Sequence, residues 1–219
     1  MTFVYGGRQT RASVALERYN AHTAQWVWRM ALKRKGQEFR RHIVATANRL
    51  FYQRGFNQAS FSDIAEAADI PRGNFYYYFK TKDEILEAVV DYRLESIRAM
   101  LAEWDAAFTD PRDRLKRYVQ ILLNEEGDIL RYGCPMGSLT VELSKTQLQL
   151  QSRAQEMFQV FFEWLKAQFL ALGRARASRD HALHLLAATQ GASLVVNAFD
   201  DRAFLRKEAN RLKQWIDEL

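Results

Sequence analysis

The feature that most constrains this chain is the spacing of its apolar residues, which recur at intervals of three and four over most of its length. This spacing places apolar side chains on one face of an α-helix, whereas a half-buried strand needs strict alternation. Residues suited to tight hairpins are also scarce, because the 219 residues include only ten glycines and three prolines. The sequence therefore predicts an all-α protein.

A chain of helices with short connections is expected. The first helix runs from Gln37 to near Gly55, and its apolar residues are Phe39, Ile43, Val44, Ala47, Leu50 and Phe51. Longer helices are expected over Lys82–Phe108, Pro111–Gly127, Pro135–Leu143, Gln147–Leu172, Arg179–Phe199 and Asp201–Leu219. Asp110, Ser178 and Asp200 precede three of them and favour helix N-termini.

Charge divides the chain unevenly. Residues 1–82 contain 14 Lys and Arg against 5 Asp and Glu, whereas residues 83–219 contain 18 against 21. A basic first third with a net charge of +9 favours contact with a polyanion, either a nucleic acid or an anionic lipid surface.

The single cysteine, Cys134, cannot form an intramolecular disulfide, which favours a reducing compartment. No apolar run approaches the 18 residues that would span a bilayer. Gln25 and Arg29 interrupt the best candidate for the apolar segment of a signal peptide. The sequence predicts a cytoplasmic protein without a membrane partner.

Residues 1–35 are expected to form a flexible basic extension. They have no clean period, contain Gly6 and Gly7, and carry seven basic residues against a single acidic one. The extension is either an arm that touches phosphates or translated upstream sequence without a role, since Met30 offers an alternative start.

Residues 60–86 contain two short helical segments joined by a tight turn. Ser60 and Asp63 form a capping-box pattern before the first segment, and Pro71 suits the first turn of the second. Thr81 and Glu84 form another capping-box pattern. Phe75, Tyr78 and Phe79 are expected in the core. This is a helix-turn-helix pattern, which suits DNA recognition.

This segment resembles the N-terminal domain of TetR-family transcriptional regulators over about residues 37–86. The resemblance is carried by Ile64-Ala65, Gly73, Tyr76, Tyr78-Phe79 and Lys82. Asp69 departs from the family, which usually has glycine in this turn, but aspartate tolerates a left-handed backbone better than most residues.

The resemblance implies that residues 73–78 enter the major groove of operator DNA. Outward side chains there are suited to the task, because Asn74 can read adenine, Arg72 can read guanine and Tyr77 can contact a thymine methyl. Hydroxyls, a lysine and a helix N-terminus suit phosphates. The predicted DNA-binding residues are Ser60, Ser62, Arg72, Gly73, Asn74, Tyr76, Tyr77 and Lys82.

Cys134 is the sharpest feature of the remaining chain. Gly133, Cys134 and Pro135 lie at the expected start of a helix, with Cys134 at the N-cap and Pro135 at the first helical position. Helix amides there favour a thiolate, which reacts with electrophiles and oxidants. Residues 131–144 also resemble the TetR subgroup that includes the electrophile-responsive repressor of N-ethylmaleimide reductase. Cys134 is therefore either a sensor or a small buried apolar side chain.

Residues 83–219 are expected to bind an effector and to form a homodimer, as the resemblance implies. The aromatic and apolar residues that line a pocket or fill the core are Trp104, Phe108, Tyr118, Leu122, Met136, Leu139, Phe158, Phe161, Phe162 and Phe169. The predicted dimer interface combines small residues of the helix 179–199 with Leu205, Leu212, Trp215 and Ile216.

Other classes of protein are weaker fits. His181 and His184 lie three residues apart, but no HExxH pattern, cysteine pair, phosphate loop or nucleophile elbow accompanies them. The sequence predicts no metal site, no cofactor and no enzymatic activity. We expect an extension over residues 1–35, a helix-turn-helix domain over 36–82, and an effector-binding and dimerisation domain over 83–219. The predicted function is that of a TetR-type repressor, and the alternative is a helical module that binds a membrane surface or a protein through its basic third.

Overall fold

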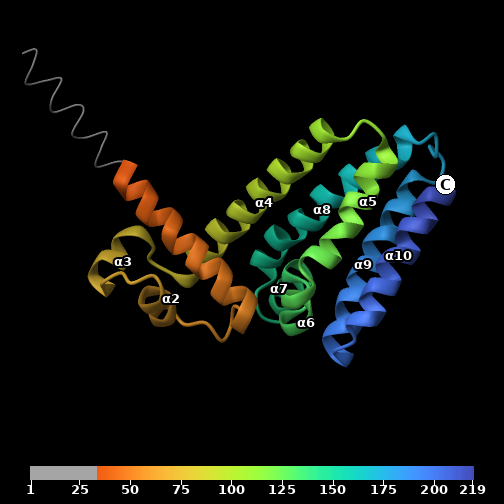
Figure 1. Cartoon of the computed structure of the whole chain (residues 1–219). Helices are drawn as coiled ribbons and strands as arrows, with labels where there is room; N and C mark the ends of the chain where they lie inside the picture. The colour runs from red at the N-terminus through yellow and green to blue at the C-terminus, as the bar shows by residue number, and fades with distance from the viewer. Residues whose placement is uncertain (1–33) are drawn as a thin grey trace, which may run out of the picture. The chain divides into compact units, whose positions relative to one another are not determined.

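The computed structural model describes residues 34–219, without the side chains of Arg72, Thr146 and Leu148. The predicted extension over residues 1–35 thus lies almost entirely outside the described residues. Among the described residues, 34–43 belong to one unit and Val44–Leu219 form a second, compact unit. The described residues are helical and contain no strand, as the periodicity predicts (Figure 1).

A helix occupies residues 34–54, so it already includes Gly36 rather than beginning at Gln37. Two short helices follow, α2 (Phe61–Ala67) and α3 (Arg72–Tyr78). Ser60 caps α2 with the predicted capping box: its hydroxyl accepts from the Asp63 amide at 3.0 Å, and the Asp63 carboxylate accepts from the Ser60 amide at 2.8 Å. Asp69 adopts the left-handed conformation, with φ 51°, so the turn forms without glycine.

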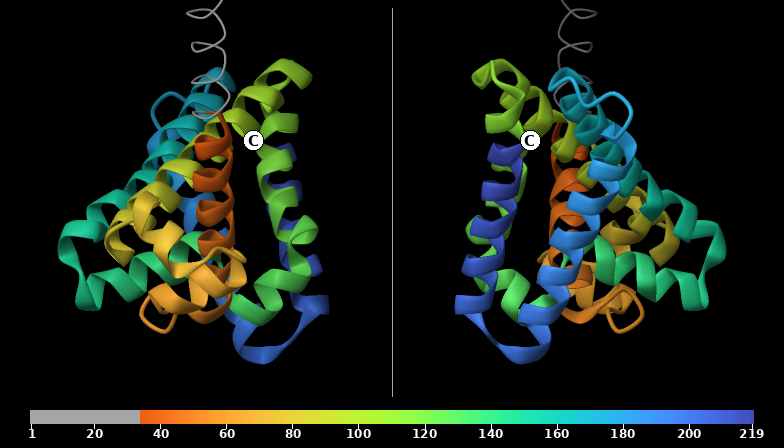
Figure 2. Two further views of the ribbon diagram at one scale, coloured as in Figure 1. Left: turned by 90° about the vertical axis from the view of Figure 1, so that its left-hand side faces the viewer. Right: turned by 90° about the vertical axis from the view of Figure 1, so that its right-hand side faces the viewer.

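Seven further helices follow in the described part of the chain: α4 (Lys82–Ala107), α5 (Pro111–Asn124), α6 (Glu126–Tyr132), α7 (Pro135–Thr146), α8 (Leu148–Ala171), α9 (Ser178–Phe199) and α10 (Arg202–Glu218). Helix α8 packs against α4, α7 and α9, while α10 packs against α5 and α9. Figure 2 shows the turn that joins α9 to α10 at the lower end of the bundle.

Clusters of buried apolar side chains stabilise the described helices. One gathers side chains from α4, α5, α8, α9 and α10 around Trp104, Phe161 and Phe169. In α3, Phe75 and Phe79 are buried as predicted, whereas Tyr78 is only half-buried. Large side chains of this kind each gain about 1.5–3 kcal/mol from burial, which orients α3 with its other side toward solvent.

Several helix ends differ from the predictions. The expected helix 111–127 ends at Asn124, and a separate α6 follows, favoured by Glu126 and Asp128 in its first turn. Thr81 caps α4, but the Glu84 carboxylate accepts from the Lys80 amide, so no reciprocal capping box forms. Ser178 is the first residue of α9 rather than its cap.

Asp200 does not cap α10. It ends α9 in a left-handed conformation with φ 55°, and Asp201 caps α10 instead by accepting from the Phe204 amide at 2.9 Å. Asp200 stands where glycine usually closes a helix, and the resulting sharp reversal sets α10 beside α9.

Helix α9 corrects the expectation that no segment is long and apolar enough to span a bilayer. Over Ser178–Phe199 it passes that test by length and composition, with one third of the window buried. The signal is weak, because a core helix passes the same test. The apolar residues of α9 lie on two sides of the helix. One side packs against α8 and α10, and the other is open to solvent, where Leu194 and Phe199 are 69% and 77% exposed.

Candidate nucleic-acid interface and cavity

Helix α3 presents a mixed polar and aromatic surface. Gly73 and Asn74 are exposed, and the side chains of Tyr76 and Tyr77 are 52% and 80% exposed. The Tyr76 side chain is held in place by α2, because its ring stacks on that of Phe61 at a centroid distance of 5.0 Å. The structure thus brings the predicted α3 residues to one surface, while the side chain of Arg72 lies outside the described part.

Gly73 has open space around it. A Cβ atom built there meets nothing within 4 Å, and its φ lies outside the left-handed region. Neither packing nor backbone conformation therefore requires glycine inside this chain. A glycine at an exposed helix position suits close approach by another molecule's backbone, such as a phosphate chain.

Three of the residues predicted to hold phosphates, Ser60, Ser62 and Lys82, lie at helix starts. Ser60 is exposed and caps α2, and Ser62 lies in the first turn of the same helix. Lys82 begins α4, and its ammonium donates to the Phe56 carbonyl at 2.9 Å and lies 4.3 Å from the centre of the Phe56 ring. An ammonium has three donors, so this tether leaves Lys82 two for a phosphate.

Helix α7 is tied to the helix-turn-helix segment near both of its ends. Before its start, the Tyr52 hydroxyl donates to the Gly133 carbonyl at 2.8 Å. Toward its end, the Glu142 carboxylate accepts from the Phe56 and Asn57 amides at 2.9 and 2.7 Å. These amides precede α2, so a movement of α7 would be transmitted to the loop that leads into α2.

Cys134 occupies the predicted N-cap of α7. Its Sγ accepts from the Gly137 amide at 3.4 Å, and the thiol is half-buried rather than sealed in the core. Gly137 lies close to the Gln190 side chain: a Cβ at this position would be 2.8 Å from Gln190 Oε1, so the glutamine side chain would have to move.

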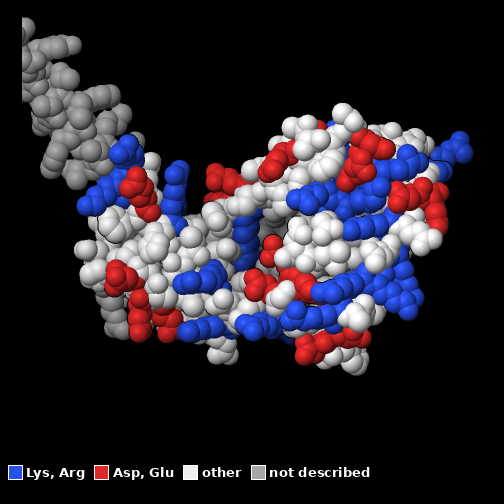
Figure 3. All heavy atoms as spheres, in the orientation of Figure 1, with Lys and Arg blue, Asp and Glu red and all other residues white. Residues whose placement is uncertain are grey.

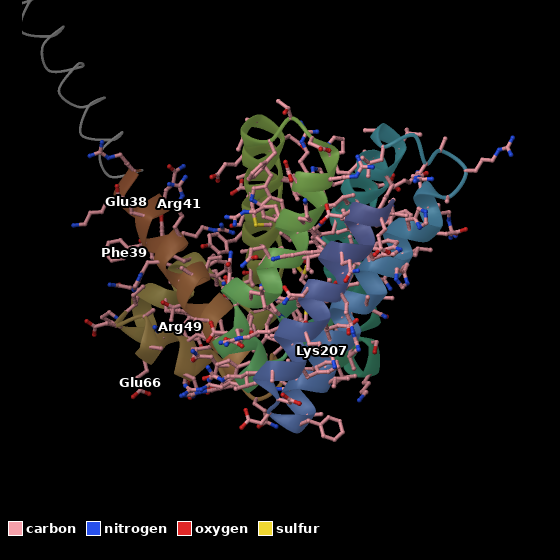
Figure 4. All side chains as sticks on the ribbon, turned by 45° about the vertical axis from the view of Figure 1, so that its right-hand side comes forward. Glu38, Phe39, Arg41, Arg49, Glu66 and Lys207 are labelled. Atoms are coloured by element: carbon pink, nitrogen blue, oxygen red, sulfur yellow. The ribbon has the colours of Figure 1, made fainter. Side chains whose placement is uncertain are left out.

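A cavity of about 620 Å³ opens beside Cys134. Its wall combines the first helix with α4, α5, α7, α8 and α9, and includes Tyr52, Arg93, Met100, Tyr118, Cys134 and Phe161. Figure 3 shows a hollow on one face with both basic and acidic side chains around it. Arg49, labelled in Figure 4, comes from the first helix and also lines the cavity. Cavities of this size accept small organic ligands.

Two of the three tyrosines that line the cavity, Tyr118 and Tyr52, are withdrawn from water in different settings. Burial raises the pKa of Tyr118, whose hydroxyl lies 3.0 Å from that of Thr189. Burial and the Asp128 carboxylate raise the pKa of Tyr52, so the phenol stays protonated and donates to Gly133. Both remain neutral hydrogen-bonding groups at physiological pH.

Only some of the predicted pocket residues reach this cavity. Tyr118, Leu122, Met136 and Phe161 line it, whereas Trp104, Phe108, Phe162 and Phe169 belong to the core beside it. Arg93, Asn48 and Glu142 were not predicted. Arg93 could have been singled out from the sequence, because it lies four residues from both Val89 and Ile97 on the apolar face of its helix, where a charged side chain is unexpected.

The dimer prediction needs correction in its α10 part and at two of its small α9 residues, Ala192 and Ser193, which are buried within the chain. Leu205, Leu212 and Ile216 are buried within the chain. They pack on α5 and α9 and are not available to a partner. Among the residues of α9 exposed to solvent are Leu183, Ala187, Gly191, Leu194 and Ala198, at intervals of three and four.

The histidine pair of α9 is not part of a metal-binding cluster. His184 contacts the Trp215 ring, and residues 34–219 contain no group of three or more potential metal ligands.

Known families cover the chain in two adjacent segments. Residues 43–89 match the model of bacterial regulatory proteins of the tetR family, and residues 94–211 match the LmrA/YxaF-like transcriptional regulator C-terminal domain. The second segment alone covers more than half of the chain.

Individual relatives agree with these families. The transcriptional repressor NemR of Escherichia coli is 32% identical over 113 residues, a match that spans 51% of this chain and about half (55%) of NemR. An HTH-type regulator of Lactococcus lactis is 26% identical over 81% of this chain and 92% of its own. The structure of reduced E. coli NemR shares the fold, with a TM-score of 0.70, 24% identity and coverage of 81% of this chain and 96% of that one. The resemblance to the NemR subgroup is thus confirmed, and the chain belongs to the TetR family of bacterial regulatory proteins.

Proposed function

We propose that this protein is a transcriptional repressor that binds a palindromic operator as a homodimer and leaves it when an effector binds the cavity or Cys134 is modified. The observation that carries the proposal is the two-sided α3. Phe75 and Phe79 anchor one side in the core, while Asn74, Tyr76 and Tyr77 face solvent on a family-matched helix-turn-helix. A helix held in this way can lie in the major groove.

Within this proposal, residues 36–82 form the DNA-binding domain. Asn74, Tyr77 and Arg72 read bases, while Ser60, Ser62, Tyr76 and Lys82 hold phosphates and Gly73 allows close approach. The exposed and half-buried positions of these residues, Arg72 apart, support the assignment. The exposed apolar stripe of α9 supports a dimer, because a second copy could cover it by two-fold symmetry.

The effector-binding domain is proposed over residues 83–219. Cys134 lies in the cavity wall and at the N-cap of α7, and Glu142 lies two turns further along the same helix. An adduct or ligand at the first end would displace α7 and pull on the amides of Phe56 and Asn57 at the other. Release is then a shift between two conformations that differ in affinity for the operator.

We further propose that the protein is cytoplasmic and acts without catalysis, as a regulator rather than an enzyme. The relatives are transcription regulators. The alternative of a membrane-surface or protein-binding module finds no support among them.

Fluorescence anisotropy tests the proposal with a labelled duplex from the DNA upstream of the protein's own gene. The wild type and the Cys134→Ser variant are titrated with and without N-ethylmaleimide, whose double bond adds to a thiol and forms a thioether. Loss of binding in the wild type alone would establish a thiol switch. Binding that ignores the reagent would leave a non-covalent effector, and absence of sequence-specific binding would contradict the proposal.

A further inference from the structure

Arg93 is a charged side chain in the wall of the cavity, on α4. Two hydrogen bonds fix it: its Nε donates to Asn48 Oδ1 at 2.6 Å, and its Nη1 donates to the Pro135 carbonyl at 2.8 Å. Both acceptors are neutral. They orient the guanidinium but do not balance its charge. The two bonds use two of its five N–H groups, so three remain to bind a ligand.

No carboxylate balances this cation among residues 34–219. None of the ion pairs of the described residues includes Arg93, although Glu125 and Asp128 line the same cavity. The groups nearest to Arg93 that favour its charge are the side chains of Cys134 and Tyr52, and neither is a carboxylate. Removal from water lowers the pKa of Arg93 to about 10, so the side chain is still a cation at neutral pH. A withdrawn charge without a counter-ion is costly, and such charges are usually paired.

The rest of the wall suits an apolar body. Met100, Ile121, Leu122, Met136 and Phe161 contribute side chains to it. Apolar lining with a few polar groups that fix orientation is the usual character of a small-molecule site. The Arg93 cation lies in the same wall. A ligand with one acidic end and one apolar end would pair with this cation and also pack against the apolar side chains.

We propose that the effector is an apolar carboxylic acid whose carboxylate pairs with the guanidinium of Arg93. The inference rests on the proposed function and names the effector class for the same cavity. Arginine is well suited to the role, because its planar fork matches a carboxylate and the pairing is strong in a site withdrawn from water. The carboxylate would also compete with Asn48 and Pro135 for Arg93. Binding would thereby loosen a contact between the first helix, α4 and α7.

Isothermal titration calorimetry on the full chain without DNA tests the inference with matched pairs. The probes are 1-naphthoate against its neutral analogue 1-naphthamide, and decanoate against decanamide. At least one acid is expected to bind about tenfold more tightly than its amide. Arg93→Gln should reduce that preference to within about twofold, and Arg93→Lys should keep part of it because the charge remains. Arg98→Gln, an exposed position on the same helix, is the control and should keep the full preference.

Three results would overturn the inference: neither acid binds below about 1 mM, an amide binds as well as its acid, or Arg93→Gln keeps the preference. Unchanged circular dichroism and melting temperature in the variants establish that the fold is intact. Operator binding by the wild type is measured separately. A normal acid preference without specific DNA binding would therefore contradict the proposed function alone, and specific DNA binding without the preference would contradict the effector class alone.

Discussion

At the scale of single residues, α3 separates groups that stabilise the fold from groups that are free to bind. Phe75 and Phe79 are fully buried, whereas Gly73 has no neighbour that a methyl group would meet. Stability and DNA affinity should consequently respond to different substitutions within one short helix.

Gly73→Ala is expected to leave the unfolding free energy unchanged or to raise it by up to about 1 kcal/mol, because alanine favours the helix. The same methyl group should lower operator affinity about tenfold by holding the phosphate backbone away. Gly127→Ala in α6, where a Cβ also meets nothing within 4 Å, is the matched control and should leave DNA binding intact. Urea unfolding and anisotropy measure the two effects, and equal DNA affinity in both variants would remove Gly73 from the interface.

Lys82→Ala and Asn74→Ala should weaken DNA binding in different ways. Loss of a phosphate contact at Lys82 should weaken all duplexes alike and make the salt dependence shallower, while loss of Asn74 should relax one base position by about 1–3 kcal/mol. Lys82→Ala should also cost about 1 kcal/mol of stability, because its ammonium donates to the Phe56 carbonyl. Competition with a panel of operator variants separates the two patterns, and uniform loss for both would contradict the assignment.

At the scale of helices, local signals were predictable from the sequence and distant contacts were not. The predicted caps rest on hydrogen bonds between residues at most three positions apart. The structure contains these bonds at Ser60, Asp63, Asp110 and Cys134. The start of α6 was missed because Glu125 makes no side-chain cap bond there. The contacts of Arg93 with Asn48 and of Glu142 with Phe56 join residues 45 and 86 positions apart, and no periodicity encodes such a pairing.

Glu142→Gln tests the tie between α7 and the loop before α2. An amide has one acceptor oxygen and no charge, so one of the two bonds to the Phe56 and Asn57 amides is lost and the other weakens. The unfolding free energy should fall by about 1 kcal/mol, and these two amides should exchange hydrogen faster. Glu103→Gln, at an exposed position of α4, is the control. Unchanged protection of both amides, followed by NMR, would show that α7 does not hold this loop.

At the scale of the whole molecule, the exposed apolar surface of α9 is the proposed dimer interface. Leu194 is 69% exposed and belongs to a stripe of small and apolar residues. Leu194→Glu should place a charge in the proposed interface and convert the dimer to a monomer, which sedimentation velocity resolves. Leu170→Glu, at a 55% exposed position of α8, should remain dimeric. A wild type that sediments as a monomer at micromolar concentration would count against the two-fold arrangement.

The central claim is that this molecule recognises an operator with two copies of α3. The most direct measurement is the affinity for a palindromic duplex from its own upstream region, followed as a function of salt concentration. About five phosphate contacts per subunit, or about ten per dimer, predict a slope of log affinity against log salt near −9, together with a clear preference over a scrambled duplex of equal length. Equal affinity for the scrambled duplex, or a slope near −2, would contradict the account.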